Sequence, residues 1–293
     1  MATDAALAVF EDARPRLFGI AYRMMGTVSE AEDLVQEAWL RWQGADRAAV
    51  REPAAFLATT VTRLALNELD SARARRERYV GPWLPEPVDT SADPALGAER
   101  AEALSFAVLV LLERLSPAER AAYVLHEAFD YPYRRIAEVL ETSEANARQL
   151  GSRARAHLAR ASTASVTPAE RERLLGAFLA AAQTGDLEGL EAVLAEDVVA
   201  LSDGGGVVHA ARRPVVGRAK VAAFLLGVSE KFVADVRFVP AAYNGDLAFV
   251  GLRGGAPMSV FALDVGPDGI RGFYNVMNPA KLSRIEVLPG HSG

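Results

Sequence analysis

The sequence of 293 residues contains no cysteine, which excludes disulfide bonds, thiol chemistry and zinc sites built on cysteine ligands. Its four histidines, at positions 126, 157, 209 and 291, do not have the spacing of a metal site. We therefore expect no metal and no cofactor. The chain is 51% hydrophobic and 24% charged, proportions typical of an ordinary globular protein, and it is long enough for two or three domains.

Long hydrophobic runs are also absent. The longest spans Phe106 to Leu112, far short of the roughly 20 apolar residues that cross a bilayer. The stretch from Met1 to Arg16 carries Asp4, Glu11 and Asp12 and lacks the apolar centre of a signal peptide. We therefore expect a cytoplasmic protein that does not contact a membrane.

Excess positive charge is missing as well. The formal net charge is −6, and residues 1–165 hold 20 arginines and no lysine against 24 acidic residues, which gives −4. Positive charge is local in this part of the chain. One cluster comprises Arg73, Arg75, Arg76 and Arg78, and another lies between Arg148 and Arg160, where four arginines occur without an acid. Two small basic patches on an acidic body predict nucleic-acid binding that depends on a large partner.

A helix-turn-helix pattern occupies residues 116–160. Ser116-Pro117-Ala118-Glu119 is typical of a helix start, because serine and glutamate can form a capping box and proline suits the first helical position. A short polar turn ends at Ser143, which can cap the last helix. The expected helices run from 117 to about 129, from 131 to 140 and from 144 to about 160.

The last of these helices has an apolar face and a polar face. Ala147, Leu150, Ala154 and Leu158 recur at helical spacing and are expected to pack inward. The opposite face carries side chains that can bond phosphates and base edges, as a recognition helix in the major groove requires: Asn146, Arg148, Gln149, Ser152, Arg153 and Arg155. The alternative is an ordinary solvated amphipathic helix, since short helix-turn-helix patterns occur widely.

The chain divides into blocks with different patterns. We expect an all-α domain over 1–80, a proline-rich linker over 81–95, a second all-α domain over 96–161, and an α+β domain over 167–293. In the first block, helices are expected from about Asp4 to Met25, from Thr27 or Ser29 to about Gln43, and from Pro53 into the arginine cluster.

The pattern changes after Val166. Helix starts at Thr167, Asp186 and Gly217 are followed by four strand-like runs, Val233–Ala242, Leu247–Leu252, Met258–Val265 and Ile270–Met277. Asn244-Gly245 and Pro267-Asp268-Gly269 are typical hairpin turns. Helices followed by hairpin-connected strands predict an α+β domain with a curved antiparallel sheet.

Several segments resemble one family. Tyr22–Gly26 and Ala31–Leu40 resemble region 2 of bacterial sigma factors, and residues 116–160 resemble their region 4. The short linker without a region 3 is similar to the extracytoplasmic-function group. Trp83-Leu84-Pro85-Glu86-Pro87, before a C-terminal half that resembles SnoaL-like domains of the nuclear-transport-factor-like cone fold, is similar to the SigJ-like subgroup.

Two further segments resemble signatures of that subgroup: Asp203-Gly204-Gly205-Gly206 and Asn278-Pro279-Ala280-Lys281-Leu282. The second signature usually has aspartate where this chain has Ala280. The resemblance implies a transcription initiation factor, not an enzyme, that brings core RNA polymerase to promoter DNA and acts as a monomer in the holoenzyme.

The resemblance also implies roles for individual residues. The helix from Glu30 to Trp42 would bind the clamp helices of the largest polymerase subunit through Asp33, Gln36, Glu37 and Arg41. The loop over 44–52 and the next helix would capture a flipped base of the −10 element. The melted strand and its phosphates would be lined by Arg63, Asn67, Arg73, Arg75 and Arg76. Region 4 would face the −35 element through Arg148, Gln149, Ser152, Arg153 and Arg155.

Trp83 is a large aromatic residue in a proline-rich linker, so we expect it to dock on a neighbouring domain. Together with the resemblance, this predicts that the C-terminal domain docks on the sigma domains and linker and modulates them in cis. The residues expected at this contact are Trp83, Leu84, Pro85, Glu86, Pro87, Asp203, Gly204, Gly205, Asn278, Pro279 and Lys281. The cavity of the domain could also hold an unidentified apolar ligand.

An enzyme of the SnoaL or isomerase type, with the helical half as its DNA-binding regulator, is the alternative. Its acid–base candidates are Asp203, His209, Tyr243, Asp264 and Tyr274, residue types that can act as acid or base in an apolar cavity. Asp203 heads a glycine turn, however, where aspartate commonly bonds its own backbone. Co-purification with core polymerase is expected only of a sigma factor.

Overall fold

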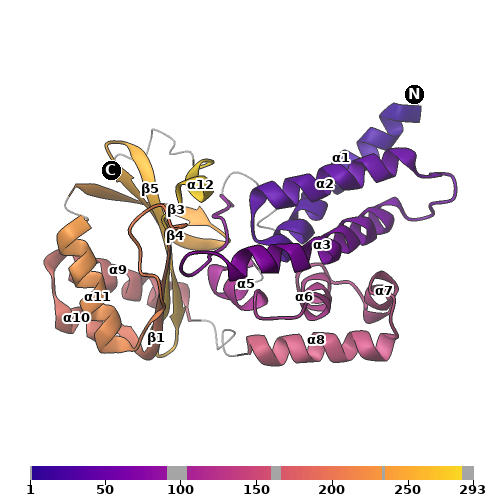
Figure 1. The fold of residues 1–293 in the computed structure, drawn as a ribbon. Helices are drawn as coiled ribbons and strands as arrows, with labels where there is room; N and C mark the ends of the chain where they lie inside the picture. Colours follow the sequence, from indigo (N-terminus) through magenta and orange to yellow (C-terminus); the bar gives the residue numbers. More distant parts are fainter. Residues whose placement is uncertain (1, 91–103, 160–165, 233–234, 286–293) are drawn as a thin grey trace. The chain divides into compact units, whose positions relative to one another are not determined.

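The computed structural model describes residues 2–90, 104–159, 166–232 and 235–285. The chain forms two compact units (Figure 1). The helical unit comprises Met1–Arg78 and Ala92–Arg160, and the C-terminal unit comprises Tyr79–Ser91 and Ala161–Gly293. The described part of the predicted linker therefore belongs to the C-terminal unit, although in sequence it lies between the two halves of the helical unit.

The first half of the helical unit contains α1 (Ala2–Met25), α2 (Val28–Gly44) and α3 (Pro53–Glu77), and the three expected helices are confirmed. Residues of α2 at helical spacing are buried: Ala31, Leu34, Val35, Ala38 and Trp42. No capping box forms between Thr27 and Glu30 at the start of α2. Thr27 is the cap residue, but its hydroxyl donates to Glu30 Oε2 at 2.6 Å and accepts no backbone amide.

The second half contains α5 (Phe106–Leu112), α6 (Pro117–Tyr123), the π-helical turn η2 (Val124–Ala128), α7 (Tyr133–Val139) and α8 (Glu144–Leu158). The capping box of Ser116 and Glu119 is confirmed, and Ser143 caps α8 by accepting the Asn146 amide at 3.2 Å. The predicted helix–turn–helix is therefore present. Its turn passes through Glu141 at φ 52°, a left-handed conformation that usually favours glycine.

The C-terminal unit places helices on a sheet. Helices α9 (Pro168–Thr184), α10 (Leu187–Val193) and α11 (Arg218–Phe232) lie on one face (Figure 1), and a short α12 (Pro279–Leu282) follows the last strand. The strands are β1 (Leu194–Asp203), β2 (Val215–Val216), β3 (Val236–Tyr243), β4 (Asp246–Arg253), β5 (Ala256–Gly266) and β6 (Gly269–Val276). The core between the layers includes Leu174, Phe178, Val221, Phe261 and Phe273.

The sheet has the order β2-β1-β6-β5-β4-β3. The four predicted strands and both hairpin turns are confirmed, and so is the α+β class. The four predicted strands are antiparallel to their neighbours among themselves, as expected, but the whole sheet is mixed because β1 pairs with β6 in parallel. Strand β1 was not predicted: it follows α10 without a turn and contains Ala195-Glu196-Asp197, residues that are rare in strands. Its parallel partner β6 is the last strand in the sequence, so a local sequence pattern could not predict the pairing.

Candidate polymerase, DNA and linker interfaces

The exposed face of α2 carries the four candidates for polymerase contact. Asp33, Gln36 and Arg41 are exposed, and Glu37 accepts a hydrogen bond from Arg41 Nε at 3.0 Å. Leu40 lies on the same face and is 54% exposed. Apolar side chains occupy the centres of protein interfaces, so Leu40 is a further candidate for this contact. Its position outside the buried set of α2 could have been read from the sequence.

Three of the −10 candidates are exposed on α3. Asn67 and Arg73 reach solvent, and Arg73 Nε lies 3.7 Å from Glu77 Oε1. Arg75 is 54% exposed, binds Glu68 Oε1 at 2.9 Å and also pairs with Glu30. These pairs are close to water, so their contribution to stability is small. Phosphate oxygens of a DNA strand can replace the carboxylates.

Arg63 connects α3 to the helix-turn-helix. Its Nε donates to the carbonyl of Val139 at 3.1 Å, and its Nη2 donates to the carbonyl of Glu138 at 2.9 Å. The same Nη2 lies 3.1 Å from Glu141 Oε1. Val139 is the last residue of α7, where carbonyl groups lack helical partners and a cation is favourable. In this conformation a −10 candidate of region 2 therefore binds region 4.

Arg76 makes a second connection and is only 14% exposed. It bonds the Glu113 carboxylate and the Met25 carbonyl. Glu113 Oε1 lies 2.6 Å from Arg120 Nη1, and Arg120 Nε donates to the Arg23 carbonyl at 3.0 Å. Burial lowers the pKa of Arg120, and the neighbouring Glu113 charge opposes this shift. Arg76 is thus engaged inside the helical unit, where Glu113 neutralises part of the buried arginine charge.

All five −35 candidates are exposed on α8. Arg148 pairs with Glu144 and lies 5.3 Å from the centre of the Tyr133 ring. Arg153 Nε lies 3.1 Å from Glu119 Oε1. The helix therefore presents a face of hydrogen-bond donors held by exposed, exchangeable ion pairs.

The remaining members of this face are Gln149, Ser152 and Arg155. Arg155 Nη1 lies 3.0 Å from Glu127 Oε1, and Gln149 and Ser152 are open to solvent. Arg134 on α7 is also exposed and was not selected from the sequence. In helix-turn-helix proteins the helix before the recognition helix crosses the DNA backbone, so Arg134 is a further phosphate candidate.

Asp203 is the central acceptor of the linker site, which consists of Tyr79, Leu84, Asp203, Asn278 and Lys281. Asp203 is fully buried. Its Oδ1 accepts from the Tyr79 hydroxyl at 2.6 Å and from the Gly205 amide at 3.0 Å. Its Oδ2 accepts from the Leu84 amide at 2.9 Å and from Lys281 Nζ at 2.7 Å. Four donors thus compensate the loss of water around one buried carboxylate.

Lys281 and Asn278 complete the linker site. Lys281 also donates to the Leu84 carbonyl, and its ammonium group lies 4.2 Å from the centre of the Trp83 ring, a cation–π contact. Asn278 Nδ2 donates to the Tyr79 hydroxyl at 2.7 Å, and its Oδ1 accepts the Ala280 amide at 3.0 Å. Burial raises the pKa of Tyr79, and the Asp203 carboxylate raises it further. The neutral phenol is therefore the stable form in this site.

The structure explains why the two signatures have glycine at positions 204 and 205 and can have alanine at position 280. Gly205 has φ +62°, and a side chain on it would collide with Asn278. A side chain on Gly204 would collide with the Val208 carbonyl. Ala280 and Pro279 are exposed, and Ala280 contributes its backbone amide to the cap. Alanine at position 280 is thus compatible with the site.

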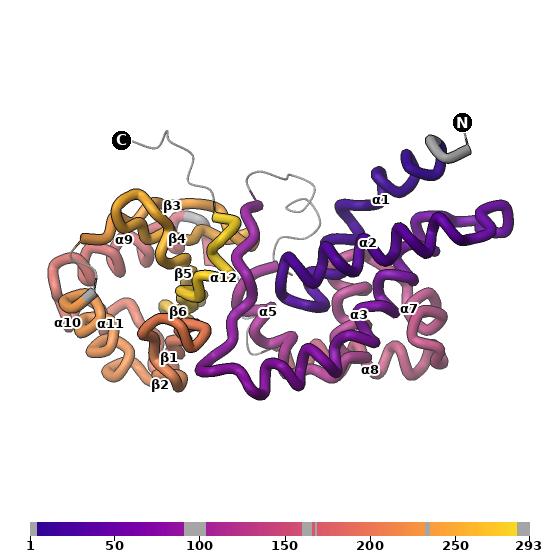
Figure 2. The backbone as a smooth tube through the Cα atoms, turned by 45° about the horizontal axis from the view of Figure 1, so that its top comes forward, coloured from indigo at the N-terminus to yellow at the C-terminus, as the bar shows by residue number. Residues whose placement is uncertain are grey.

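The rest of the linker follows the edge of the sheet (Figure 2). Leu84, Pro85, Glu86, Pro87 and Val88 are buried. The Val88 amide donates to Asn244 Oδ1 at 3.1 Å, and the Asn244 amide donates to the Val88 carbonyl at 2.9 Å. Asp89 forms a bridge with Tyr243, and the Thr90 amide donates to the Ala242 carbonyl at 3.1 Å. The linker therefore pairs with the end of edge strand β3 through an isolated β-bridge and the flanking hydrogen bonds.

The structure brings Trp83 and Leu84 of the linker together with Asp203 and Lys281 of the two signatures. Sequence analysis missed Tyr79 and Asn244. Asn244 was interpreted only as part of a hairpin turn, and it does adopt the left-handed φ of 55° that such a turn requires. Tyr79 directly follows the arginine cluster and gave no separate signal.

The acid–base candidates of the alternative enzyme do not line the cavity described in the C-terminal unit. A cavity of about 820 Å³ lies between the helices and the sheet, and none of the five candidates lines it. Asp203 is in the linker site, His209 is exposed, and Tyr243 lies at the end of β3. Asp264 and Tyr274 alternate with the cavity-facing residues of β5 and β6, so they lie on the opposite face of the sheet.

In the described parts of the chain, no group of three or more histidine, aspartate or glutamate side chains is placed to hold a metal ion. No helix in those parts is both long and apolar enough to cross a membrane.

Two family models match the helical unit, Sigma-70 region 2 over residues 9–75 and Sigma-70 region 4 over residues 105–158. The ECF RNA polymerase sigma factor SigJ of Mycobacterium tuberculosis is 41% identical over 291 residues, which cover 94% of this chain and 92% of that protein. This chain belongs to the ECF RNA polymerase sigma factors. Sigma factors bind core RNA polymerase and promoter DNA, so this sigma factor is a transcription initiation factor and not an enzyme.

The similarity of this sigma factor to its relatives extends beyond the two matched regions. The crystal structure of the Mycobacterium tuberculosis SigJ matches with a TM-score of 0.77 at 37% identity, covering 94% of this chain and 98% of that chain. The probable ECF RNA polymerase sigma factor SigI of the same species is 36% identical over 195 residues, which are 65% of this chain and 67% of that protein. The resemblance inferred from the sequence is therefore confirmed.

Proposed function

We propose that this sigma factor, working in the cytoplasm as a monomer within holoenzyme, binds core polymerase through the exposed face of α2. Leu40 lies at the centre of this face, surrounded by Asp33, Gln36, Glu37 and Arg41. The −10 element is read by α3 and the loop before it, and the −35 element by α8. The exposed donor face of α8 supports this assignment, because its side chains are free to exchange carboxylate partners for DNA.

Regions 2 and 4 must separate when promoter DNA binds. Arg63 bonds the Val139 carbonyl, and the nine residues from there to Arg148 span at most about 32 Å. The −10 and −35 elements lie about 25 base pairs apart, which is about 85 Å of duplex. One molecule therefore cannot keep the Arg63 contact and place both regions on their elements. The described conformation is a closed form of the helical unit.

The C-terminal unit modulates this opening in cis, and the linker site is the observation that carries the proposal. Residues 79–90 are the start of the covalent connection between region 2 and region 4, and they are bonded to the C-terminal unit at both Asp203 and Asn244. Capture of this segment restricts the positions that the two regions can adopt on polymerase. Trp83, in contact with Lys281, is part of that restraint. A small ligand in the cavity of the same unit would act on it.

Run-off transcription with core RNA polymerase tests the proposal. The full chain is compared with a truncation after residue 165 and with Trp83→Ala, on a template from upstream of the protein's own gene. We expect all three proteins to co-purify with polymerase, and the truncation and Trp83→Ala to change transcript yield in the same direction. A full chain that neither binds polymerase nor starts a transcript contradicts the polymerase interface. Equal yields from all three proteins contradict modulation in cis.

A further inference from the structure

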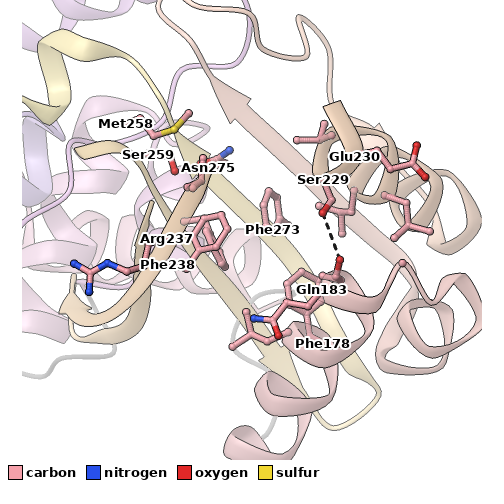
Figure 3. A pocket seen from close by; sticks show the side chains of 18 of the residues that line it. Phe178, Gln183, Ser229, Glu230, Arg237, Phe238, Met258, Ser259, Phe273 and Asn275 are labelled. Atoms are coloured by element: carbon pink, nitrogen blue, oxygen red, sulfur yellow. Dashed lines mark hydrogen bonds between the residues drawn. The ribbon is translucent and has the colours of Figure 1, made fainter. Parts of the chain in front are cut away.

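The C-terminal unit contains a cavity of about 820 Å³, a size typical of small-molecule sites. It lies between α9, α11 and the inward face of β3, β5 and β6 (Figure 3). Its walls are mainly apolar and include four phenylalanines. The ring centres of Phe261 and Phe273 are stacked 5.4 Å apart, and the Phe238 ring meets Phe261 edge-on with 5.4 Å between centres. The charged lining residues are Glu230 and Arg237, both exposed, with opposite signs. The interior of the cavity therefore suits an uncharged apolar molecule.

Asn275 supplies a specific polar group in this apolar wall. Its Oδ1 atom is buried and finds no hydrogen-bond donor among the residues that the structure describes. Asn275 lines the cavity together with Ser259 of the neighbouring strand (Figure 3). A buried carbonyl oxygen without a donor destabilises a fold, and a hydrogen-bond donor supplied from the cavity would remove this cost.

Gly251 contributes to the shape of the same wall. It pairs with Ser259 across β4 and β5 and with Phe238 across β3 and β4. A side chain on Gly251 would collide with Ser259 Oγ and lie 3.1 Å from Phe238. The absence of a side chain at this position leaves room for these two cavity residues.

We propose that this cavity binds an uncharged organic molecule with an apolar ring system and one hydrogen-bond donor, which bonds Asn275 Oδ1. The ring system packs among Phe178, Phe238, Phe261 and Phe273. The donor is an N–H or O–H group, because an amide oxygen can only accept.

The cavity is directly connected to the linker site, and this second step rests on the modulation in cis proposed above. Met277 lines the cavity, and its amide donates to the Asp203 carbonyl at 2.7 Å. The next residue, Asn278, bonds Tyr79. A ligand that displaces Met277 therefore shifts the backbone at Asp203 and at Asn278, two residues of the linker site. Ligand binding thus changes how firmly the linker is held.

The probe for the test is N-phenyl-1-naphthylamine, a neutral diarylamine with one N–H group that becomes fluorescent in apolar surroundings. It is titrated into the full chain without polymerase. We expect saturable binding at one site, about tenfold weaker binding to Asn275→Leu, which keeps the volume but removes the acceptor, and loss of binding to Ala182→Phe, which fills the cavity. Tyr274→Phe, next to Asn275 but on the opposite face of β6, is the matched control and should bind normally.

Binding that does not saturate, or that survives Ala182→Phe unchanged, overturns the site. Normal binding to Asn275→Leu overturns the role of its amide. The linker step is read separately as hydrogen exchange of the Leu84 and Val88 amides, which should change at least threefold when the probe is bound. Saturable binding without that change keeps the cavity site and overturns its connection to the linker, whatever the outcome of transcription.

Discussion

In the helical unit, Arg63 joins regions 2 and 4 from a position near the surface, whereas in the C-terminal unit the linker is held by a buried lysine and aspartate. The side chains of Arg63 and Glu141 are 42% and 76% exposed. Those of Lys281 and Asp203 are 8% and 0% exposed. Both arrangements join segments far apart in sequence, but they differ in access to water.

This difference predicts different lifetimes for the two contacts. Exposed ion pairs contribute about 0–1 kcal/mol and are screened by salt, and DNA phosphates can replace their carboxylates. A buried pair is costly to separate, because each charge would be left without its partner away from water. The Arg63 contact between regions 2 and 4 is therefore expected to open more readily than the linker contact at Asp203.

The largest effect is expected from breaking the linker site. Asp203→Ala should lower the free energy of unfolding by about 3–5 kcal/mol, because it leaves Lys281 buried without a counter-charge. It also removes the acceptor of Tyr79 and of the Leu84 amide. Urea unfolding of the full chain measures the loss, and hydrogen exchange of residues 79–90 locates it.

A double variant sharpens that test. Asp203→Asn combined with Lys281→Met removes both charges at similar volume. It should cost less than the sum of the two single changes, because each single change leaves a lone buried charge and the double variant leaves none. A loss below about 1 kcal/mol for Asp203→Ala would show that the ion pair does not hold the linker.

A smaller effect is expected from loosening regions 2 and 4. Arg63→Ala should cost about 1 kcal/mol or less and populate the open form. Because the chain has no cysteine, spin labels at Ala74→Cys on α3 and Ala156→Cys on α8, both exposed, report the distance directly. We expect the population with a longer distance between the two labels to grow with salt concentration. In Arg63→Ala this population should appear at lower salt.

Arg73→Ala is the matched control for this experiment, because its partner Glu77 lies on the same helix and the pair does not bridge the regions. A distance distribution that neither salt nor Arg63→Ala changes would contradict the closed form held by exposed pairs.

The smallest effect is expected at alkaline pH. Burial, with the nearby Asp89 charge, raises the pKa of Tyr243 to about 12, above its usual value near 10. Both states are protonated below pH 10, so this stabilisation is complete there. Above pH 10 only the unfolded tyrosine ionises, and stability is lost as pH rises toward 12. Tyr243→Phe should make this loss shallower in unfolding experiments from pH 9 to 12.

Tyr79→Phe should flatten the same pH dependence, because burial and Asp203 also raise the pKa of Tyr79. It has the additional cost of a lost hydrogen bond to Asp203, which Tyr243→Phe does not share. If neither variant alters the fall in the free energy of unfolding between pH 9 and 12, these tyrosines do not cause the pH dependence.

The sequence by itself determined the local structure and the family of this sigma factor. The capping box at Ser116, the cap at Ser143 and the apolar spacing of α8 act over a few residues, so they could be predicted without a partner surface. Trp83 could also be predicted to dock from the sequence, because a large aromatic side chain favours burial whichever surface covers it.

Only the tertiary structure decided which distant groups meet. The parallel pairing of β1 with β6, the turn of Arg63 toward α7 and the anchoring of the linker by Asn244 each join segments far apart in sequence. An arginine that can bind phosphate can equally bind a helix end, and an asparagine in a turn can also accept an amide. Local patterns fix what a side chain is able to bind, and packing chooses the partner.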